Sequence, residues 1–350
     1  KDFQGLRLPA LGMGAMRLPV IGGDDAKIDE AAAAEIVAYA MANGVNYFDT
    51  GWFYHGWTSE TVLGRILDHY PRDSYYLTTK FPGNTLDNLN KVEEIFQRQL
   101  EKTGKDYFDF YLLHNVYELN AEAYLDPKYG LLDFLLRQKE AGRIRHLGFS
   151  THGSPETIAR FLDGCGQHME FGQIQLNWLD WSLQNAEAKV KLLRERGLPI
   201  WVMEPLRGGK LLQLPERDVE KLRALRPEES LPGWGFRFLQ SIPGITMVLS
   251  GFSTLAQAQE NIRTFSAEKP LSPAEWEAIL SIADSLRERA LVPCTACRYC
   301  TAHCPQGLDI PRLLELYNDK LLGGVFAAMG LRAIPESHHP KACIGCQACE

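Results

Sequence analysis

The chain has 350 residues, 45% of them hydrophobic, which is enough for one large folded unit and a small appendage. The formal net charge of −7 disfavours a nucleic-acid partner, and no run approaches the roughly eighteen apolar residues of a membrane-spanning helix. The first residues lack the apolar stretch of a signal peptide and the cysteines look reduced, so we expect a cytoplasmic protein without a membrane partner.

Between about residues 10 and 265, short apolar runs alternate with amphipathic helical stretches. Most of these runs are too short and too apolar for half-solvated hairpin strands and indicate buried parallel strands. In chain order the predicted strands are Leu11–Met16, Asn46–Asp49, Tyr76–Lys80, Phe108–His114, His146–Ser150, Gly172–Gln175, Ile200–Met203 and Met247–Leu249. The predicted helices are Ala31–Ala42, Glu60–His69, Leu89–Lys102, Leu131–Glu140, Pro155–Leu162, Ala186–Glu195, Leu231–Gln240 and Leu255–Phe265.

Residues typical of helix caps support these boundaries. Ser59, Ser154 and Thr254 stand at predicted N-caps, and four glycines stand at predicted C-caps. The glycines are Gly44, Gly104, Gly142 and Gly197. Eight strands alternating with eight helices predict an α/β fold, a parallel (β/α)8 barrel of TIM type over residues 1–285. An open doubly wound sheet is the alternative, but no G-x-G-x-x-G follows an early strand.

Residues 286–350 are predicted to form a small second domain. A helix over Ser272–Leu291 leads into this domain, and Pro311–Tyr317 is a second, short helix. The apolar stretch Leu321–Leu331 is expected to pack the small domain onto the barrel.

Seven cysteines in this region have the spacing of iron–sulfur ligands. The first run reads C-x2-C-x2-C-x3-C before a proline, and the second reads C-x2-C-x2-C. In bacterial ferredoxins such runs hold 4Fe–4S clusters, and the fourth cysteine of one run serves the other cluster. A zinc ribbon is the alternative, and disulfides are disfavoured because only Cys165 lies elsewhere. We therefore expect residues 286–350 to form a ferredoxin-like iron–sulfur domain. It would carry one or two 4Fe–4S clusters on Cys294, Cys297, Cys300, Cys304, Cys343, Cys346 and Cys349.

Cys304 is expected to complete the ligand set of the second run in this crossed arrangement. The first run then needs a further thiolate, which we expect from a cysteine beyond Glu350.

Groups that transfer protons follow three consecutive predicted strands. Asp49 and Tyr54 follow the second strand, Lys80 ends the third and His114 ends the fourth. In a parallel barrel the reactive groups sit at the carboxyl ends of strands, so these four should meet on one face. An ammonium lowers the pKa of a neighbouring phenol, a carboxylate holds the ammonium, and an imidazole orients a carbonyl oxygen. A salt bridge that closes the barrel, with Tyr54 a mere loop aromatic, is the alternative.

The segment around Tyr54 resembles the signature of the aldo-keto reductases. It reads F-D-T-G-W-F-Y-H-G followed by S-E-x-x-L-G, where the family has F-D-T-A-x-x-Y-G-x-x-S-E-x-x-L-G. The resemblance covers about residues 5–265, and with the cysteine runs it points to the iron–sulfur subgroup. It implies hydride transfer between a nicotinamide and a small carbonyl or alcohol substrate. By the same resemblance Tyr54 is the general acid, Lys80 lowers its pKa, Asp49 pairs with Lys80 and His114 positions the substrate carbonyl.

The resemblance also implies a site for NADP or NAD. The residues expected at the carboxamide are Ser150, Thr151, Gln175 and Asn177, and those expected at the pyrophosphate are Pro205, Leu206, Arg207 and Gly209. The residues expected at the adenine end are Gly251, Ser253, Gln257, Glu260 and Asn261. Met203 replaces the tyrosine that many members stack on the nicotinamide. No Lys or Arg lies in residues 251–257, so no strong preference for a 2′-phosphate is expected.

An alternative function is a non-enzymatic sensor of redox state that binds a nicotinamide. The complete set of Asp, Tyr, Lys and His favours the enzyme. A hydride carries two electrons and a cluster transfers one, and the sequence shows no flavin signature. The cluster is therefore expected either to hold the small domain in place or to pass electrons to a partner protein.

Overall fold

The structure of the chain is a computed structural model. It describes residues 1–83, 85–290, 292, 294, 299–322, 324, 327–346 and 349. The described chain forms two compact units. The first unit comprises Lys1–Pro205 with Glu229–Leu271, and the second comprises Leu206–Glu228 with Ser272–Glu350. The division of the chain at residue 285 stays a prediction.

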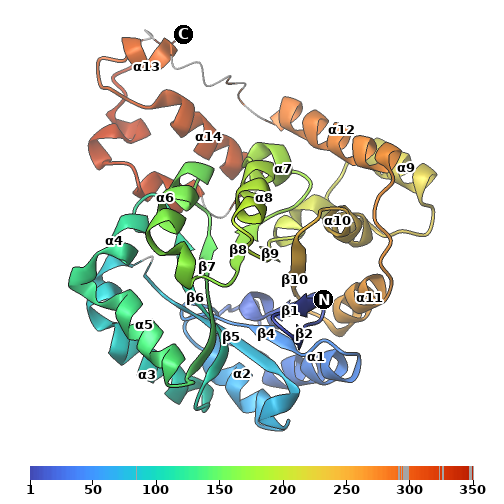
Figure 1. Cartoon of the computed structure of the whole chain (residues 1–350). Helices are drawn as coiled ribbons and strands as arrows, with labels where there is room; N and C mark the ends of the chain where they lie inside the picture. Colours follow the sequence, from blue (N-terminus) through green and yellow to red (C-terminus); the bar gives the residue numbers. More distant parts are fainter. Residues whose placement is uncertain are drawn as a thin grey trace. The chain divides into compact units, whose positions relative to one another are not determined.

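The first unit is a closed parallel barrel of eight strands in the order β10-β3-β4-β5-β6-β7-β8-β9 (Figure 1). These strands are β3 (Leu11–Gly14), β4 (Tyr47–Asp49), β5 (Tyr76–Phe81), β6 (Phe108–Val116), β7 (Ile144–Thr151), β8 (Gly172–Gln175), β9 (Ile200–Met203) and β10 (Ile245–Gly251). The predicted (β/α)8 barrel and the place of each strand in the sequence are confirmed. Register pairs such as Gly14 with Asp49 and Asp49 with Thr78 bring the strand ends to one edge, which we call the catalytic end.

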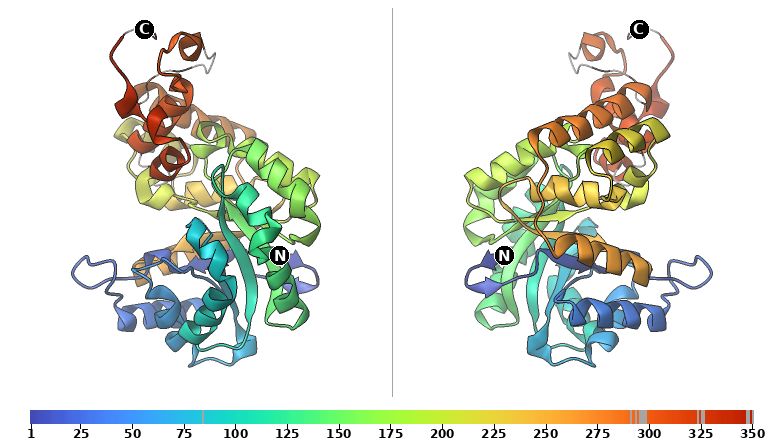
Figure 2. Two further views of the ribbon diagram at one scale, coloured as in Figure 1. Left: turned by 90° about the vertical axis from the view of Figure 1, so that its left-hand side faces the viewer. Right: turned by 90° about the vertical axis from the view of Figure 1, so that its right-hand side faces the viewer.

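Helices of the first unit surround the barrel (Figures 1 and 2). They are α1 (Glu30–Ala42), α2 (Ser59–Leu67), α3 (Val92–Thr103), α4 (Ala121–Leu125), α5 (Leu131–Glu140), α6 (Pro155–Cys165), α7 (Asp180–Leu183), α8 (Ala186–Glu195), α10 (Leu231–Gln240) and α11 (Leu255–Phe265). Ser154 and Thr254 cap α6 and α11 as predicted, each accepting a backbone N–H three residues on. Ser59 is instead the first residue of α2, and its buried hydroxyl contacts Thr50 and Ala15.

A short hairpin closes the barrel end at which the strands begin. Its strands are β1 (Asp2–Phe3) and β2 (Leu6–Arg7), which the sequence did not predict. Phe3 and Leu8 pack into a core cluster with residues from four barrel strands and with one residue that directly precedes β8. Those residues are Tyr47, Phe110, Leu112, Phe171, Trp201, Met247 and Leu249. The barrel interior at this end is therefore solid core, which leaves the catalytic end for polar chemistry.

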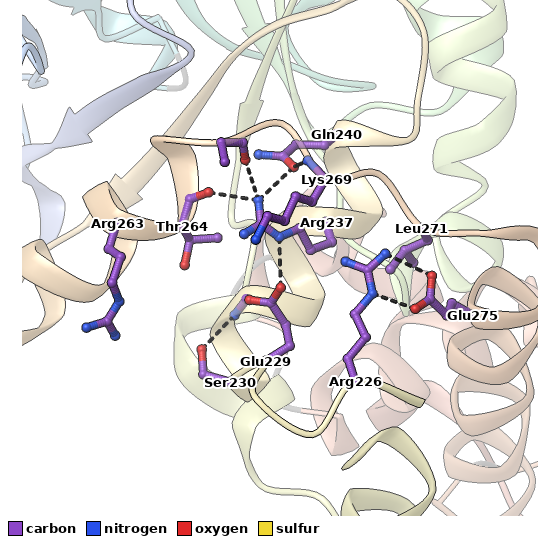
Figure 3. Close-up of polar contacts among 12 residues, drawn as sticks. Arg226, Glu229, Ser230, Arg237, Gln240, Arg263, Thr264, Lys269, Leu271 and Glu275 are labelled. Carbon is purple, nitrogen blue, oxygen red and sulfur yellow. Dashed lines mark hydrogen bonds and ion pairs between the residues drawn. The ribbon is translucent and has the colours of Figure 1, made fainter. Parts of the chain in front are cut away.

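A buried arginine fixes the segment that follows α11 (Figure 3). Arg237 of α10 donates through Nε to Glu229 at 2.9 Å. Its Nη1 donates to the carbonyl oxygens of Thr264 and Ala267 at 2.8 and 2.6 Å. The guanidinium thus satisfies carbonyl groups at the carboxyl end of α11, where a cation is also favoured by the helix dipole.

The second unit is helical in its described part. It holds α9 (Glu216–Leu225), α12 (Pro273–Ala290), α13 (Tyr299–His303), α14 (Ile310–Leu321) and α15 (Ala327–Arg332). The predicted helices over Ser272–Leu291 and Pro311–Tyr317 are confirmed as α12 and α14, while α9, α13 and α15 were not predicted. Helices α9 and α12 lie side by side (Figures 1 and 2), and Arg226 after α9 donates to Glu275 of α12 at 2.8 Å (Figure 3).

Short 3-10 helices complete the secondary structure. They are η1 (Ala15–Arg17), η2 (Arg72–Ser74), η3 (Leu86–Lys91), η4 (Pro127–Tyr129), η5 (Gly166–His168), η6 (Arg207–Leu212), η7 (Glu336–His338) and η8 (Pro340–Ala342). Among the described helices, none is long and apolar enough to span a lipid bilayer.

Candidate active site at the catalytic end of the barrel

A buried ion pair joins the ends of β4 and β5. Lys80 is fully buried, and its Nζ donates to Asp49 Oδ1 and to the Thr50 carbonyl oxygen, each at 2.6 Å. Asp49 Oδ2 has no hydrogen-bond partner among the described residues. Burial favours the neutral amine, but the Asp49 carboxylate and the Tyr54 phenol hold the pKa of Lys80 above its usual value. Lys80 therefore presents a fixed positive charge at the catalytic end.

Tyr54 and His114 lie beside this ion pair. The Lys80 Nζ is 4.9 Å from the centroid of the Tyr54 ring, and the Tyr54 and His114 centroids are 6.0 Å apart. A Cβ on Gly51 would lie 3.1 Å from Tyr54 Cζ, so glycine, where the family signature has alanine, lets the phenol rest directly on the strand end. The structure thus brings together all four residues predicted to transfer or direct protons.

The electrostatics keep both Tyr54 and His114 neutral. Burial raises the pKa of Tyr54, and the Lys80 ammonium offsets only part of that rise. Lys80 acts in the expected direction, but in this structure burial is the larger effect, so the phenol keeps its proton. Burial and the Lys80 charge together lower the pKa of His114 to about 3. His114 Nδ1 has no hydrogen-bond partner among the described residues.

The loop after Tyr54 is held by a histidine that the sequence pattern did not single out. His55, Gly56 and Trp57 all have positive φ, which is strained for the two non-glycine residues. The backbone N–H of Leu18 donates to His55 Nε2 at 3.1 Å, so Nδ1 carries the ring hydrogen and donates to the Asp25 carbonyl at 2.8 Å. His55 stands directly after the tyrosine, where the family signature has glycine, and this departure was the available signal.

The hydroxyl groups of Thr151 and Ser150, at the end of β7, differ in how many of their hydrogen bonds are made. The Thr151 hydroxyl donates to the Val116 carbonyl and accepts from Gly153 N–H, and Ser150 Oγ accepts from Asn115 N–H. Among the described residues the Ser150 hydroxyl hydrogen has no acceptor contact of its own, so it can donate to a ligand.

The side-chain amides of Gln175 and Asn177, at and after the end of β8, also differ in how many of their hydrogen bonds are made. Buried Asp180 accepts from both Gln175 Nε2 and Asn177 Nδ2. Asn177 Oδ1 also accepts two backbone N–H groups, so Asn177 shapes its loop. Gln175 Oε1 is a buried acceptor without a partner in the described chain.

The ends of β9 and β10 carry the other predicted nucleotide residues of this unit. Met203 and Glu260 are partly exposed, Pro205 is buried, and Asn261 donates to Ser250 Oγ at 3.1 Å. Ser253 N–H donates to Gln257 Oε1 at the start of α11, and Ser253 Oγ donates to the Arg17 carbonyl.

Arg17 reaches the same edge from the loop after β3. A Cβ on Gly251 would lie 2.8 Å from Arg17 Cβ, so the glycine admits this side chain. Arg17 is exposed, and its guanidinium makes no hydrogen bond or ion pair with the described residues. It is a basic group that the residues after β10 lack.

The predicted pyrophosphate loop belongs to the second unit. Leu206 accepts the backbone N–H of Gly209, and Arg207 is buried in an ion pair with Asp319 of α14. The predicted phosphate residue is therefore engaged by the cysteine-rich segment.

The cysteine runs lie in the same unit, and Cys297 falls outside the described residues. Gly307, just after Cys304, lies near the His338 ring, and a Cβ on it would be 3.6 Å from Nε2. Cys304 Sγ accepts the Leu308 N–H at 3.4 Å, and Cys343 Sγ accepts the Gly345 N–H at 3.5 Å. Among the described residues, no three His, Cys, Asp or Glu side chains are grouped closely enough to hold a metal ion.

Comparisons with known proteins agree with this barrel fold. The model of the aldo/keto reductase family matches residues 10–284. A probable aldo-keto reductase 1 of Glycine max is 27% identical over 214 residues, covering 59% of this chain and 58% of that protein. L-galactose dehydrogenase of Arabidopsis thaliana is 28% identical over 322 residues, covering 81% and 93%.

A solved structure supports the fold. The holo form of the aldo-keto reductase AKR11C1 from Bacillus halodurans superposes with a TM-score of 0.64 at 23% identity, covering 79% of this chain and 93% of that one. Because the family model spans most of the chain, including both the barrel strands and the Tyr54 segment, this protein belongs to the aldo/keto reductase family of oxidoreductases.

Proposed function

We propose that this chain is an NAD(P)-dependent oxidoreductase that interconverts a small carbonyl compound and its alcohol. One observation carries the proposal: a protonated phenol, a fixed ammonium and a neutral imidazole converge at the open end of the barrel. A neutral phenol and a neutral imidazole N–H are donors suited to a carbonyl oxygen that gains negative charge. The family assignment supports this chemistry. A non-enzymatic redox sensor that binds a nicotinamide would not require the buried Lys80–Asp49 ion pair.

The side chains have distinct roles in this proposal. Tyr54 is the general acid in reduction and the base in oxidation. Lys80 stabilises the phenolate that Tyr54 becomes on giving up its proton, and Asp49 holds Lys80 in place. His114 stays neutral above about pH 3 and donates its N–H to the carbonyl oxygen, which orients the substrate.

The residues at the catalytic end fit a nicotinamide. The orphaned acceptor Gln175 Oε1 matches a carboxamide NH2, and the free Ser150 hydroxyl hydrogen matches its carbonyl oxygen. When bound, NAD(P)H supplies the hydride for carbonyl reduction, and the oxidised form accepts it in the reverse reaction.

At the other end of the nucleotide site, Ser253, Gln257, Glu260 and Asn261 are proposed to hold the adenosine. Arg17 is the basic side chain at this edge, and we propose that it meets phosphate charge. Because a single exposed arginine supplies this charge, the discrimination between NADPH and NADH should be modest.

A paired measurement tests the catalytic proposal. Purified, anaerobically prepared protein is screened with aldehydes, ketones and alcohols by following the absorbance of the reduced nicotinamide. Tyr54→Phe should abolish turnover on the best substrate and leave the Kd for the nucleotide within about twofold, because it removes only the proton donor. Full turnover in Tyr54→Phe would refute the role of the phenol. Failure of the wild-type protein to bind either nucleotide would refute the oxidoreductase proposal itself.

We further propose that the second unit is a ferredoxin-type domain carrying one or two 4Fe–4S clusters. The cysteine spacing supports this, as do the backbone N–H groups that donate to Cys304 and Cys343, since such bonds stabilise cluster thiolates. Crossed ligation, in which Cys304 joins Cys343, Cys346 and Cys349, is part of this proposal and rests on the cysteine spacing. The cluster would either brace the unit or serve an electron-transfer partner.

Iron and sulfide analysis with electron paramagnetic resonance of the reduced protein tests this assignment. We expect about four iron and four sulfide per cluster. Cys304→Ser should disturb the cluster of the second run. Stoichiometric zinc with negligible iron in anaerobically prepared protein would refute the assignment.

A further inference from the structure

A buried carboxylate lies behind the Tyr54–Lys80 site. Glu60 in the first turn of α2 is fully buried and accepts three donors from the barrel and from α3. They are Thr79 Oγ1 at 2.6 Å, Gln99 Nε2 at 2.7 Å and Lys102 Nζ at 2.5 Å. A buried charge persists only when its partners satisfy it, so this set is held as a unit.

One arm of this network holds the strand that carries Lys80. Thr79, which bonds Glu60, directly precedes Lys80 at the end of β5. Gln99 Nε2 donates to the Lys80 carbonyl oxygen at 3.0 Å as well as to Glu60, and Gln99 Oε1 accepts from the Tyr111 hydroxyl at 2.6 Å. The backbone at Lys80 is thus tied to the carboxylate from two sides.

The other arm reaches the loop that carries Tyr54. Lys102 lies three residues after Gln99 on the same face of α3, and its side chain is 12% exposed. Its Nζ lies 4.6 Å from the centroid of the Trp52 ring, two residues before Tyr54. A cation over an aromatic face is attracted to it, so the ammonium links Trp52 to the Glu60 carboxylate.

Close packing of the helices makes this bridge possible. A Cβ on Gly64 of α2 would lie 2.3 Å from the Thr103 carbonyl oxygen of α3, so only glycine permits this separation. The contact brings the ammonium of Lys102 within reach of Glu60.

We propose that Lys102 is a positioning residue that sets where the Tyr54 phenol lies relative to the Lys80 ammonium. It acts through Trp52 on the tyrosine loop, while Glu60, its partner, holds the lysine strand. The inference rests on the proposed role of Tyr54 as general acid.

The test compares two lysines at the end of α3. Lys105 also bonds α2, through the Gly64 carbonyl and Asp68, but it does not reach the Tyr54 loop. We expect Lys102→Met to lower kcat by at least about tenfold, since a displacement near 1 Å costs up to about a hundredfold. The nucleotide Kd should stay within about twofold. Lys105→Met should keep kcat within about twofold, and Lys102→Arg, which keeps a cation, should restore most of the loss.

The pH profile separates positioning from general loosening of the fold. Tyr54 is faced by Lys80, Asp49, His114 and Glu204, and only Lys80 lowers its pKa. If the phenol moves away from Lys80, the basic limb of kcat/KM for reduction should shift to higher pH in Lys102→Met and stay in place in Lys105→Met.

A second variant covers the case in which Lys102→Met does not fold. Trp52→Leu keeps the Glu60–Lys102 ion pair and removes the aromatic face, and it should shift the basic limb in the same direction. An unmoved limb with unchanged kcat in the folded variants would overturn the inference. The Tyr54→Phe result is a separate readout, so a failure of the positioning role is distinguishable from a failure of the proposed function.

Discussion

Removal of the Lys80 ammonium should separate the stability of the site from its chemistry. Nζ lies 2.6 Å from Asp49 Oδ1, and the two side chains are 0% and 5% exposed. In Lys80→Met the Asp49 carboxylate loses this charged partner, and its Oδ2 already has no hydrogen-bond partner in the described chain. Breaking a buried ion pair on one side costs about 3–5 kcal/mol, so we expect that loss in the free energy of unfolding.

The double variant Lys80→Met/Asp49→Asn should regain part of that loss. It leaves a neutral buried amide, whose cost is about 1–3 kcal/mol if its bonds go unmade. Turnover should stay low in both variants, because the phenolate of Tyr54 has no neighbouring cation in either. Urea unfolding gives the free energies, and the reduced-nicotinamide assay gives kcat.

The pH dependence of Lys80→Met has a defined sign. Burial raises the pKa of Asp49 even with Lys80 present, and removing Lys80 raises it further. A carboxyl group whose folded-state pKa is raised favours folding at low pH and disfavours it as the pH rises through that pKa. The stability deficit of Lys80→Met should therefore shrink toward about pH 4. A deficit below about 0.5 kcal/mol at pH 7, or wild-type turnover in the double variant, would refute the reasoning.

Four further outcomes follow from the structure. His114 has a folded-state pKa of about 3, below its unfolded value of 6.5, so its contribution to stability should be lost as the pH falls between these values. The free energy of unfolding of His114→Asn should therefore depend less steeply on pH in this range. An unchanged slope would count against a buried neutral imidazole. Phe3→Ala should destabilise the barrel by about 3–5 kcal/mol in urea unfolding, because Phe3 is 2% exposed within the core cluster; a loss under 1 kcal/mol would mean that the hairpin does not seal the barrel. Gly64→Ala should cost about 1–3 kcal/mol or more, since the methyl group would collide with a backbone carbonyl, and a neutral effect in the same assay would contradict that packing. Arg17→Met should weaken NADPH more than NADH in fluorescence titrations if the guanidinium meets the 2′-phosphate, whereas equal weakening of both would place it at the pyrophosphate.

The strands and the four central site residues could be predicted because both depend on local sequence. A strand buried on both faces is rich in apolar residues, so short apolar runs that alternate with amphipathic helical stretches indicate the barrel strands. Asp49, Lys80 and His114 each stand at the end of such a run, and the parallel topology alone brings those ends together. The spacing of the cysteines is a local property as well, and their binding of a metal cluster stays a proposal.

Some short elements were not predicted, because they contain too few residues for a hydrophobic periodicity to be recognised. The hairpin strands β1 and β2 have two residues each, and α7 has four. The positions of such elements are set by the core that they cover, and Phe3 of β1, which packs into the core at the closed end of the barrel, is an example. A pattern of hydrophobicity carries no information on which core a single phenylalanine will enter.

Partners of the site residues were decided by the tertiary structure alone. The family resemblance implies that Arg207 meets a phosphate, and the fold pairs this buried arginine with Asp319, which lies 112 residues further along the chain. The sequence pattern also offers no reason to expect that Lys102 contacts Glu60 and Trp52. The same holds for the hydrogen bonds of the two His55 ring nitrogens to Leu18 and Asp25. The sequence by itself determined which chemical groups stand at the strand ends. Which of them are charged, paired or available was decided by packing, because burial and hydrogen bonds between distant residues set those properties.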